Sequence, residues 1–566
     1  MEPASRHAPT PDSRVRQPGL TPHLRGASAR GQSPRQPSRR PTLSRRQVLL
    51  GGLVAAGAAV AGVEIERGSG HRAGVRLFGA AGSFVGFAGR SHLPSGESVA
   101  TVTVPGWRFG AGQAAFGCAV VQDGSVIVGT TPFSDNPLQP TGADMELGVL
   151  RPDAPAFRGI TVPSTRGNTI LPGNTGGGVG GGDVSAVVPL PGGSPARVMF
   201  ISTAPYHGWD VGSYGELPSI GQLVRTDTGW KYDDDRSRTA QDLAAESPAT
   251  IADAAFPLRD GGPRDNQGTT DAIVLPRSGH VIVAQYFGSG SNESGGLLAL
   301  DPRSGRVLGF WKHPSIQVFG QQVICHPRQL AADPSSKRGD ERFTVVYDTF
   351  DPAGGTVPFP IQEFSYRSDT GVIQPVSTAV RAAQDGTRME LAQFLTDGTL
   401  VVARTTQDGS SAATMAVYDK SSGERSLARY PPVPSGTDGG DSAWGATCPP
   451  DMLVAGTDRG GLVRSLSVDQ KTGRVLLGGL NGLVQSVHRK GSGKHRHWQT
   501  GKVVNLGLDL LRTPQRYPIG LRQGAIDDKR RLLWLPCNQL ILGVVPYPVP
   551  PFPLDQWIYA VSLDDL

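Results

Sequence analysis

Three short stretches of the chain repeat one arrangement of charged residues, in which an arginine stands five positions before an aspartate. They run through residues 328–333, 464–469 and 522–527. Guanidinium groups bind carboxylates and phosphates through paired hydrogen bonds. If Arg328, Arg464 and Arg522 meet at one opening, they would suit an anionic ligand. The alternative is that arginines and acidic residues of neighbouring units pair and tie these units together.

Further acidic residues fall near the same positions. Asp271 occupies the matching position in another part of the chain, and Glu390 lies within one residue of it in a fifth part. Both are therefore candidate ligand-binding residues beside the three arginines. Together with Asp183 and His326 they are also candidate ligands for a single divalent cation, since carboxylate oxygens and imidazole nitrogens bind such ions. The sequence contains no D-x-D-x-D-G loop, H-E-x-x-H, G-x-S-x-G or S-x-x-K motif, so it leaves open whether the protein is an enzyme.

The elements that must position these residues are short strands. The clearest unit has strands in residues 271–279, 280–287, 296–301 and 306–311, with a Pro-Arg-Ser-Gly turn at 302–305. Gly, Pro, Asp and Ser at the ends of β-rich runs indicate hairpins. Similar units begin near residues 114, 183, 325, 388, 462 and 520.

Repeats of this length without helices favour an all-β chain, a β-propeller of four-stranded antiparallel blades. We expect seven blades, with eight as the alternative because residues 65–112 and 430–460 fit no unit well. A strand from residues 98–104 is expected to complete the last blade. The domain boundaries that follow are a disordered basic region at 1–43, a signal segment at 44–61, an N-terminal segment at 62–112 and the propeller at 113–566.

The basic region and the start of the signal segment explain the basic character of the chain. Residues 1–46 carry a net charge of +8, and the remainder carries about −2. We therefore exclude nucleic acid as a partner. Residues 44–50 (SRRQVLL), an apolar run to Val63 and Ala59-Val60-Ala61 are typical of a twin-arginine export signal. We expect the folded protein to reach the extracellular space or the cell envelope, with a membrane contact only if the signal is not cleaved.

The four cysteines, Cys118, Cys325, Cys448 and Cys537, lie far apart in the sequence. Outside the cytoplasm they could form two disulfides in three possible pairings, or remain buried thiols.

Residues 300–311 (LDPRSGRVLGFW) resemble the repeats of quinoprotein-type propellers, in which an Asp, a Gly turn and a Trp close a blade. Residues 517–521, 525–528 and 533–535 resemble gluconolactonase-like and NHL-type propellers. The second resemblance implies one divalent ion held by acidic and amide side chains of different blades, with Asp271 and Glu390 as two of the ligands.

Three hypotheses about function follow. The first is a secreted or cell-surface binding module for a small anion, a polymer or a protein. The second is a metal-dependent hydrolase or lactonase with its site at the mouth of the central channel, and the third is a quinoprotein dehydrogenase.

Overall fold

The structure of the protein is a computed structural model, and the chain divides into two compact units, Met1–Gly74 and Val75–Leu566. All residues described below belong to the second unit. They are residues 84–85, 89–92, 98–101, 104–108, 113–132, 145–151, 158–162, 183–203, 218–256, 269–285, 295–314, 316–318, 321–350, 361–376, 387–406, 414–419, 426–429, 463–479, 483–490, 497–505, 520–521, 523–538 and 557–566. The predicted basic region 1–43 and signal segment 44–61 lie outside them.

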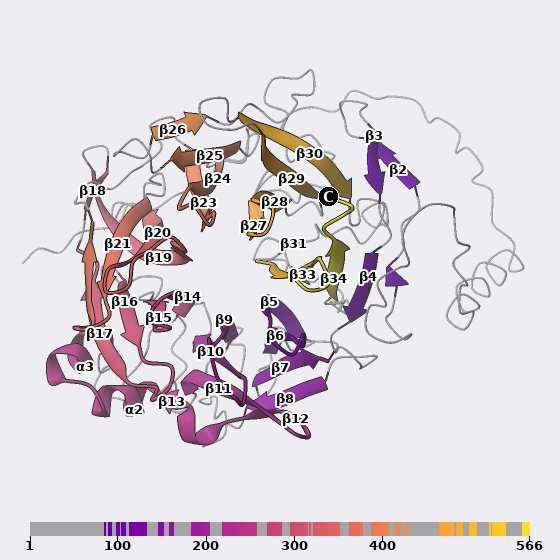
Figure 1. Cartoon of the computed structure of the whole chain (residues 1–566). Coiled ribbons are helices and arrows are strands. Elements are labelled where there is room, and N and C mark those ends of the chain that lie inside the picture. Colours follow the sequence, from indigo (N-terminus) through magenta and orange to yellow (C-terminus); the bar gives the residue numbers. More distant parts are fainter. Residues whose placement is uncertain are drawn as a thin grey trace, which may run out of the picture. The chain divides into compact units, whose positions relative to one another are not determined.

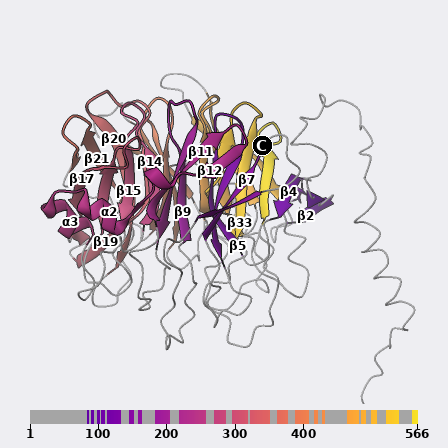
Figure 2. The same ribbon diagram turned by 90° about the horizontal axis from the view of Figure 1, so that it is seen from below.

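The described strands form seven sheets that stand around a central axis, as Figure 1 shows for the Val75–Leu566 unit. Seen from the side, their strands stand roughly parallel to that axis (Figure 2). The innermost strands of successive sheets are neighbours all the way around. This arrangement confirms the predicted all-β propeller.

Six of the sheets are blades built from four consecutive strands; two of these gain one further short strand, and blade 6 gains two. Blade 1 comprises β5 (Gln113–Val120), β6 (Val126–Pro132), β7 (Met145–Leu150) and β8 (Arg158–Val162). Blade 2 comprises β9 (Asp183–Pro189), β10 (Arg197–Thr203), β11 (Pro218–Thr226) and β12 (Gly229–Tyr232), with β13 (Arg238–Thr239) added. Blade 3 comprises β14 (Thr269–Val274), β15 (Val281–Gln285), β16 (Gly296–Leu300) and β17 (Val307–Lys312). Blade 4 comprises β19 (Gln321–Ala332), β20 (Glu341–Phe350), β21 (Ile361–Arg367) and β22 (Val372–Pro375), with β18 (Ile316–Val318) added. Blade 5 comprises β23 (Thr387–Phe394), β24 (Leu400–Thr406), β25 (Thr414–Asp419) and β26 (Ser426–Arg429). Blade 6 comprises β27 (Val463–Asp469), β28 (Arg474–Gly479), β29 (Leu483–Lys490) and β30 (His497–Asn505).

The seventh sheet, here called the closing sheet, is composite. Its strands are β31 (Gly520–Leu521), β32 (Ala525–Asp527), β33 (Leu532–Asn538), β34 (Trp557–Ser562), β4 (Val104–Arg108) and β1 (Phe84–Val85). The expectation of seven four-stranded blades is corrected accordingly: six blades have that form, and the seventh sheet takes its outer strands from the N-terminal segment.

The closing strand also differs from the one expected. β4 pairs with β34, with Ile558 opposite Trp107, and so completes the last sheet. β3 (Ser98–Thr101), which covers most of the predicted strand, pairs in parallel with β30 of blade 6 instead, and β2 (Gly89–His92) pairs with β3. The N-terminal segment therefore extends two neighbouring sheets.

The apolar core lies between the blades. In β15 every residue is buried, because alternate side chains face opposite neighbours. Val281 and Val283 pack in a cluster with blade 2, whereas Ile282 and Ala284 pack in a cluster with blade 4. This two-sided burial explains why the strand is a continuous apolar run in the sequence.

Each innermost strand begins on one side of the propeller, here called the entry side, and ends on the other, called the turn side. On the turn side, Asp residues cap short turns. Asp301 Oδ1 accepts a hydrogen bond of 2.9 Å from the Arg303 N–H, and Gly305 closes the turn at a φ of 72°. The left-handed conformation at this position favours glycine.

Blade 2 carries the described helices, α2 (Ala240–Ala245) and α3 (Ala249–Ala255). Thr239 and Asp242 form a reciprocal capping box that begins α2. The buried side chains of both helices join the core between blades 2 and 3. Among the described residues, no helix has the length and apolar character needed to cross a membrane.

Candidate functional site

One structural feature recurs toward the entry side of all six blades: the innermost strand has one residue more than the strand paired with it. In blade 4, for example, Pro327 lies opposite Tyr347 while Gln329 lies opposite Val346, which leaves Arg328 as the extra residue. The extra residues in chain order are Phe116, Ser185, Thr270, Arg328, Glu390 and Arg464. Such β-bulges bend a strand and redirect a side chain, and they are common beside binding sites.

The bulges bring three predicted site residues to one register position. Arg328, Glu390 and Arg464 are the bulge residues of blades 4, 5 and 6, which are neighbours in the ring. Arg522 lies outside the described residues. The register on β33 slips by one residue between Leu521 and Ala525, as it does at the bulges of the six blades.

The aspartates of the repeated arginine–aspartate motif lie at the opposite end of the strand. Asp333, Asp469 and Asp527 are buried and each accepts a backbone N–H two residues further on, at 2.9 Å, 3.2 Å and 3.1 Å respectively. In blades 4 and 6 the motif therefore runs from the bulge of the innermost strand, where the arginine lies, to the turn that follows the strand, where the aspartate lies.

Asp271 follows the bulge residue Thr270 and links blade 3 to blade 4. Its Oδ1 accepts the Ala272 N–H at 2.9 Å, and its Oδ2 accepts the Leu330 N–H of β19 at 2.7 Å. Burial raises the pKa of Asp271 to about 7, although both hydrogen bonds act in the opposite direction. This carboxyl group can therefore exchange a proton near neutral pH.

Two glutamines that the sequence reasoning missed make similar links. Gln329 donates to the Ala392 carbonyl at 3.0 Å and accepts the Ala392 N–H at 2.8 Å. Gln523 donates to the Leu466 carbonyl at 2.8 Å and accepts the Leu466 N–H at 3.3 Å. Each side chain thus replaces the backbone pairing that neighbouring innermost strands lack. A signal was present in the sequence, since each glutamine directly follows an arginine of the motif.

The predicted cation site has no assembled ligand set in the described part of the chain, where no three His, Cys, Asp or Glu residues are grouped suitably for a metal. The side chains of Asp183 and Glu390 lie outside that part. His326 is fully buried on β19, and burial lowers its pKa to about 4, as does the charge of His313. The cation site stays a prediction.

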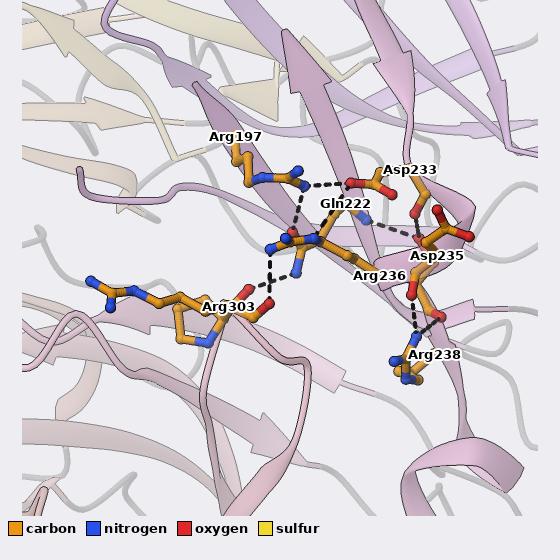
Figure 3. A network of polar contacts seen from close by, with 9 residues as sticks. Arg197, Gln222, Asp233, Asp235, Arg236, Arg238 and Arg303 are labelled. Atoms are coloured by element: carbon orange, nitrogen blue, oxygen red, sulfur yellow. Dashed lines mark hydrogen bonds and ion pairs between the residues drawn. The ribbon is translucent and has the colours of Figure 1, made fainter. Parts of the chain in front are cut away.

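Further polar contacts between blades lie on the turn side. Figure 3 shows one network, in which Arg197 pairs with Asp233 within blade 2. Gln222 donates to the Pro302 carbonyl of blade 3 at 2.8 Å, and Arg236 donates to the Arg303 carbonyl at 2.8 Å. Arginines and acidic residues of adjacent blades pair on this side, between Arg225 and Asp123 and between Arg489 and Asp397. Neither arginine belongs to the repeated motif, so the pairing expected for Arg328, Arg464 and Arg522 stays a prediction.

Cys118 and Cys325 form no disulfide. Burial raises the pKa of Cys118 to about 12, against a hydrogen bond with the backbone of Ala525. Each of the three pairings considered for two disulfides needs both cysteines, so two disulfides are not formed and the buried-thiol alternative holds for this pair. Cys448 and the side chain of Cys537 lie outside the described residues.

No protein-family model matches the chain, and no curated protein matches it either. Among solved structures, it is similar to hydrazine synthase from Kuenenia stuttgartiensis, at 10% identity and a TM-score of 0.42, over 76% of this chain and 93% of that one. It is also similar to an ulvan lyase of a new polysaccharide lyase family, at 8% identity and a TM-score of 0.41, over 81% and 96% of the two chains. A candidate 6-phosphogluconolactonase from Bacteroides uniformis matches at 9% identity and a TM-score of 0.36, over 75% and 88%.

Proposed function

We propose that this protein is an exported binding propeller that holds an anionic group at the entry-side mouth of its central channel. Arg328, Arg464 and Arg522 would bind the anion. The observation that carries the proposal is the shared register position of Arg328 and Arg464 at the bulges of blades 4 and 6. Side chains at equivalent positions of the ring would converge if they turn toward its axis, and a carboxylate or phosphate there would find several donors.

The order of residues around the ring refines this proposal. Blades 1 to 3 have Phe116, Ser185 and Thr270 at the bulge, so the charged residues are confined to one half of the ring. Glu390 stands between Arg328 and Arg464 in that half. Its carboxylate would compete with an anionic ligand for the neighbouring arginines, which moderates affinity and favours ligands with more than one acceptor group.

Export would place this binding activity outside the cytoplasm. The proposal of extracellular or cell-envelope location rests on the twin-arginine pattern of residues 44–50. A folded, ring-shaped protein suits that route, which carries proteins that have already folded.

Isothermal titration calorimetry with inorganic phosphate and citrate tests the proposal on the full chain. The triple variant R328A/R464A/R522A should lose binding, and E390Q should bind about two- to fivefold more tightly because one negative charge is removed at close range. The matched control is R303A/R306A/R338A, three exposed arginines of the turn side, which should bind like the unmodified protein. Equal binding by the two triple variants would remove the bulge arginines from the proposal.

A metal-dependent hydrolase or lactonase is the second candidate, and the pKa of Asp271 near 7 is the observation in its favour. Lactone hydrolysis that survives both exhaustive chelation and the substitution D271N would rule out this candidate.

A further inference from the structure

His313 lies one residue beyond the end of β17, at the entry-side end of the interface between blades 3 and 4. Its side chain is only 2% exposed. Trp311 of the same strand and Tyr347 of β20 both meet the imidazole edge to face, with ring centroids 4.9 Å and 4.5 Å away. An ionisable ring is therefore enclosed between two aromatic rings at a joint of the propeller.

Both ring nitrogens of His313 have a polar partner. Nδ1 is 2.5 Å from the Pro314 carbonyl oxygen, and Nε2 is 3.2 Å from Oε1 of Gln362 in β21 of blade 4. In the neutral ring, Nδ1–H donates to Pro314 and Nε2 accepts, which suits the amide nitrogen of Gln362. In the charged ring, both nitrogens donate, which suits the amide oxygen. Proton uptake by His313 is therefore coupled to the orientation of a side chain in the next blade.

The groups around His313 offer little to balance a positive charge. On β19, Cys325 and His326 are the nearest titratable residues, and neither is negative at acidic pH. Tyr347 on β20 stays neutral, because burial raises its pKa well above the ordinary value.

Two acidic residues lie on the packed strands. Glu363 is adjacent to Gln362 on β21, so its side chain points to the other face of the sheet. Asp348 lies opposite His326 in the β19–β20 pairing, and its side chain is outside the described residues. No carboxylate among the described side chains faces His313 across this joint.

We propose that the joint between blades 3 and 4 is an acid-sensitive switch, in which protonation of His313 loosens the entry-side ends of β17 and β19. Burial lowers the pKa of His313 to about 4, while the hydrogen bonds with Pro314 and Gln362 act in the opposite direction. A His whose pKa is lowered on folding contributes stability above its ordinary pKa of about 6.5, and this contribution is lost as the pH falls toward 4. The switch therefore works between pH 6.5 and 4.

The switch would reach the proposed anion site through one strand. β19 carries Cys325 and His326 beside the joint and Arg328 at the bulge. Loosening this strand would move Arg328 relative to the arginine of blade 6, so acid would weaken anion binding. This last step rests on the proposed function, whereas the loosening of the joint does not.

Hydrogen exchange of the full chain, followed by mass spectrometry from pH 7 to 4, tests the switch. After correction for intrinsic exchange rates, the protection of β19 and β20 should fall with pH, by about tenfold per pH unit for each proton taken up. His326 can supply a second proton, so the diagnostic quantity is the difference between variants. The slope that we compare is the fall of the protection factor with falling pH. The substitution H313Q should reduce this slope by about tenfold per pH unit, because one proton fewer is taken up.

The matched control is H280Q, at the turn-side end of the same joint. His280 Nδ1 is 2.7 Å from the Tyr366 hydroxyl group, and the two rings meet edge to face. H280Q should keep the slope of the unmodified protein. An unchanged slope in H313Q would overturn the proposal.

A second measurement covers the case in which H313Q does not fold. An NMR titration of the labelled histidines in the unmodified protein should show His313 neutral until the pH at which protection falls. Protonation near pH 6.5 with full protection of β19 would contradict the switch. Loss of protection without phosphate or citrate binding at any pH would reject the anion site alone.

Discussion

Arg531 and Asp469 join the closing sheet to blade 6 through two parallel hydrogen bonds, from Nη1 to Oδ1 at 3.0 Å and from Nη2 to Oδ2 at 2.5 Å. Arg531 adopts a φ of 58° in its turn, in the left-handed region where the corresponding turns of blades 5 and 6 have Gly398 and Gly473. Such a conformation costs an L-residue about 1 kcal/mol or more. The ion pair offsets this cost, since Asp469 is fully buried and needs a partner.

Removing the guanidinium should therefore destabilise the protein. We expect R531A to lower the free energy of unfolding by about 2 kcal/mol, less than for a fully buried pair because Arg531 is partly exposed. R531G loses the same ion pair but relieves the backbone strain, so it should be more stable than R531A by about 1 kcal/mol. Thermal unfolding of the two variants measures the difference, and a less stable R531G would contradict the strain argument.

The pH dependence of stability should carry a contribution from Asp271. Its pKa is raised on folding to about 7, from an ordinary value near 3.8. The folded state then holds a proton that the unfolded state has released, so the contribution is complete below pH 4 and is lost as the pH rises to 7. The unfolding temperature of the unmodified protein minus that of D271N should fall across this range and stay constant above it. A difference that does not vary with pH would show that Asp271 titrates normally.

The glutamine links between innermost strands should contribute measurably to stability. Q329L leaves the backbone N–H and carbonyl of Ala392 without their side-chain partner, which should cost about 2 kcal/mol. Gln374 on the outer strand β22 is exposed, so Q374L is a control for the same change and should have an effect near zero. Denaturant unfolding of both variants distinguishes the two positions; similar losses would contradict the link.

Ring closure should depend on β4. A chain that begins at Val75 keeps this strand, whereas one that begins at Gln113 leaves the edge of β34 without its partner. We expect the shorter chain to unfold less cooperatively and to associate through the open edge. Size-exclusion chromatography and calorimetry compare the two, and identical behaviour would show that β4 is dispensable.

The strands of blade 3 could be predicted from the sequence because each is bounded by turn residues. The strand that begins at Val281 is visible as an apolar run, and the turn from Asp301 to Gly305 is visible from its residue types. Both signals depend only on residues that are close in the sequence. Such local signals can be interpreted without knowledge of the rest of the fold.

The bulges and the closing sheet could not be predicted in the same way. That Arg328 is an extra residue follows from its pairing with β20, and no property of residues 327–329 alone requires it. β4 and β34 are separated by nearly the whole propeller in sequence, and the apolar alternation that marks a strand does not identify its partner.

The arginine–aspartate motif could be predicted in part from the sequence and in part only from the structure. Its repetition was visible in the sequence, and Arg328 and Arg464 do share a register position. The role of Asp469 depends on Arg531, a residue of another sheet, and so required the three-dimensional arrangement.

The pairing of β4 with β34 also determines when the ring can close during protein synthesis. A ribosome makes β4 before any strand of the six blades and makes β34 after all of them. β4 can pair with β1 at once, but it must wait for β34 while the blades between them are made. A nascent chain held by its ribosome with β34 still inside the exit tunnel therefore has an open ring.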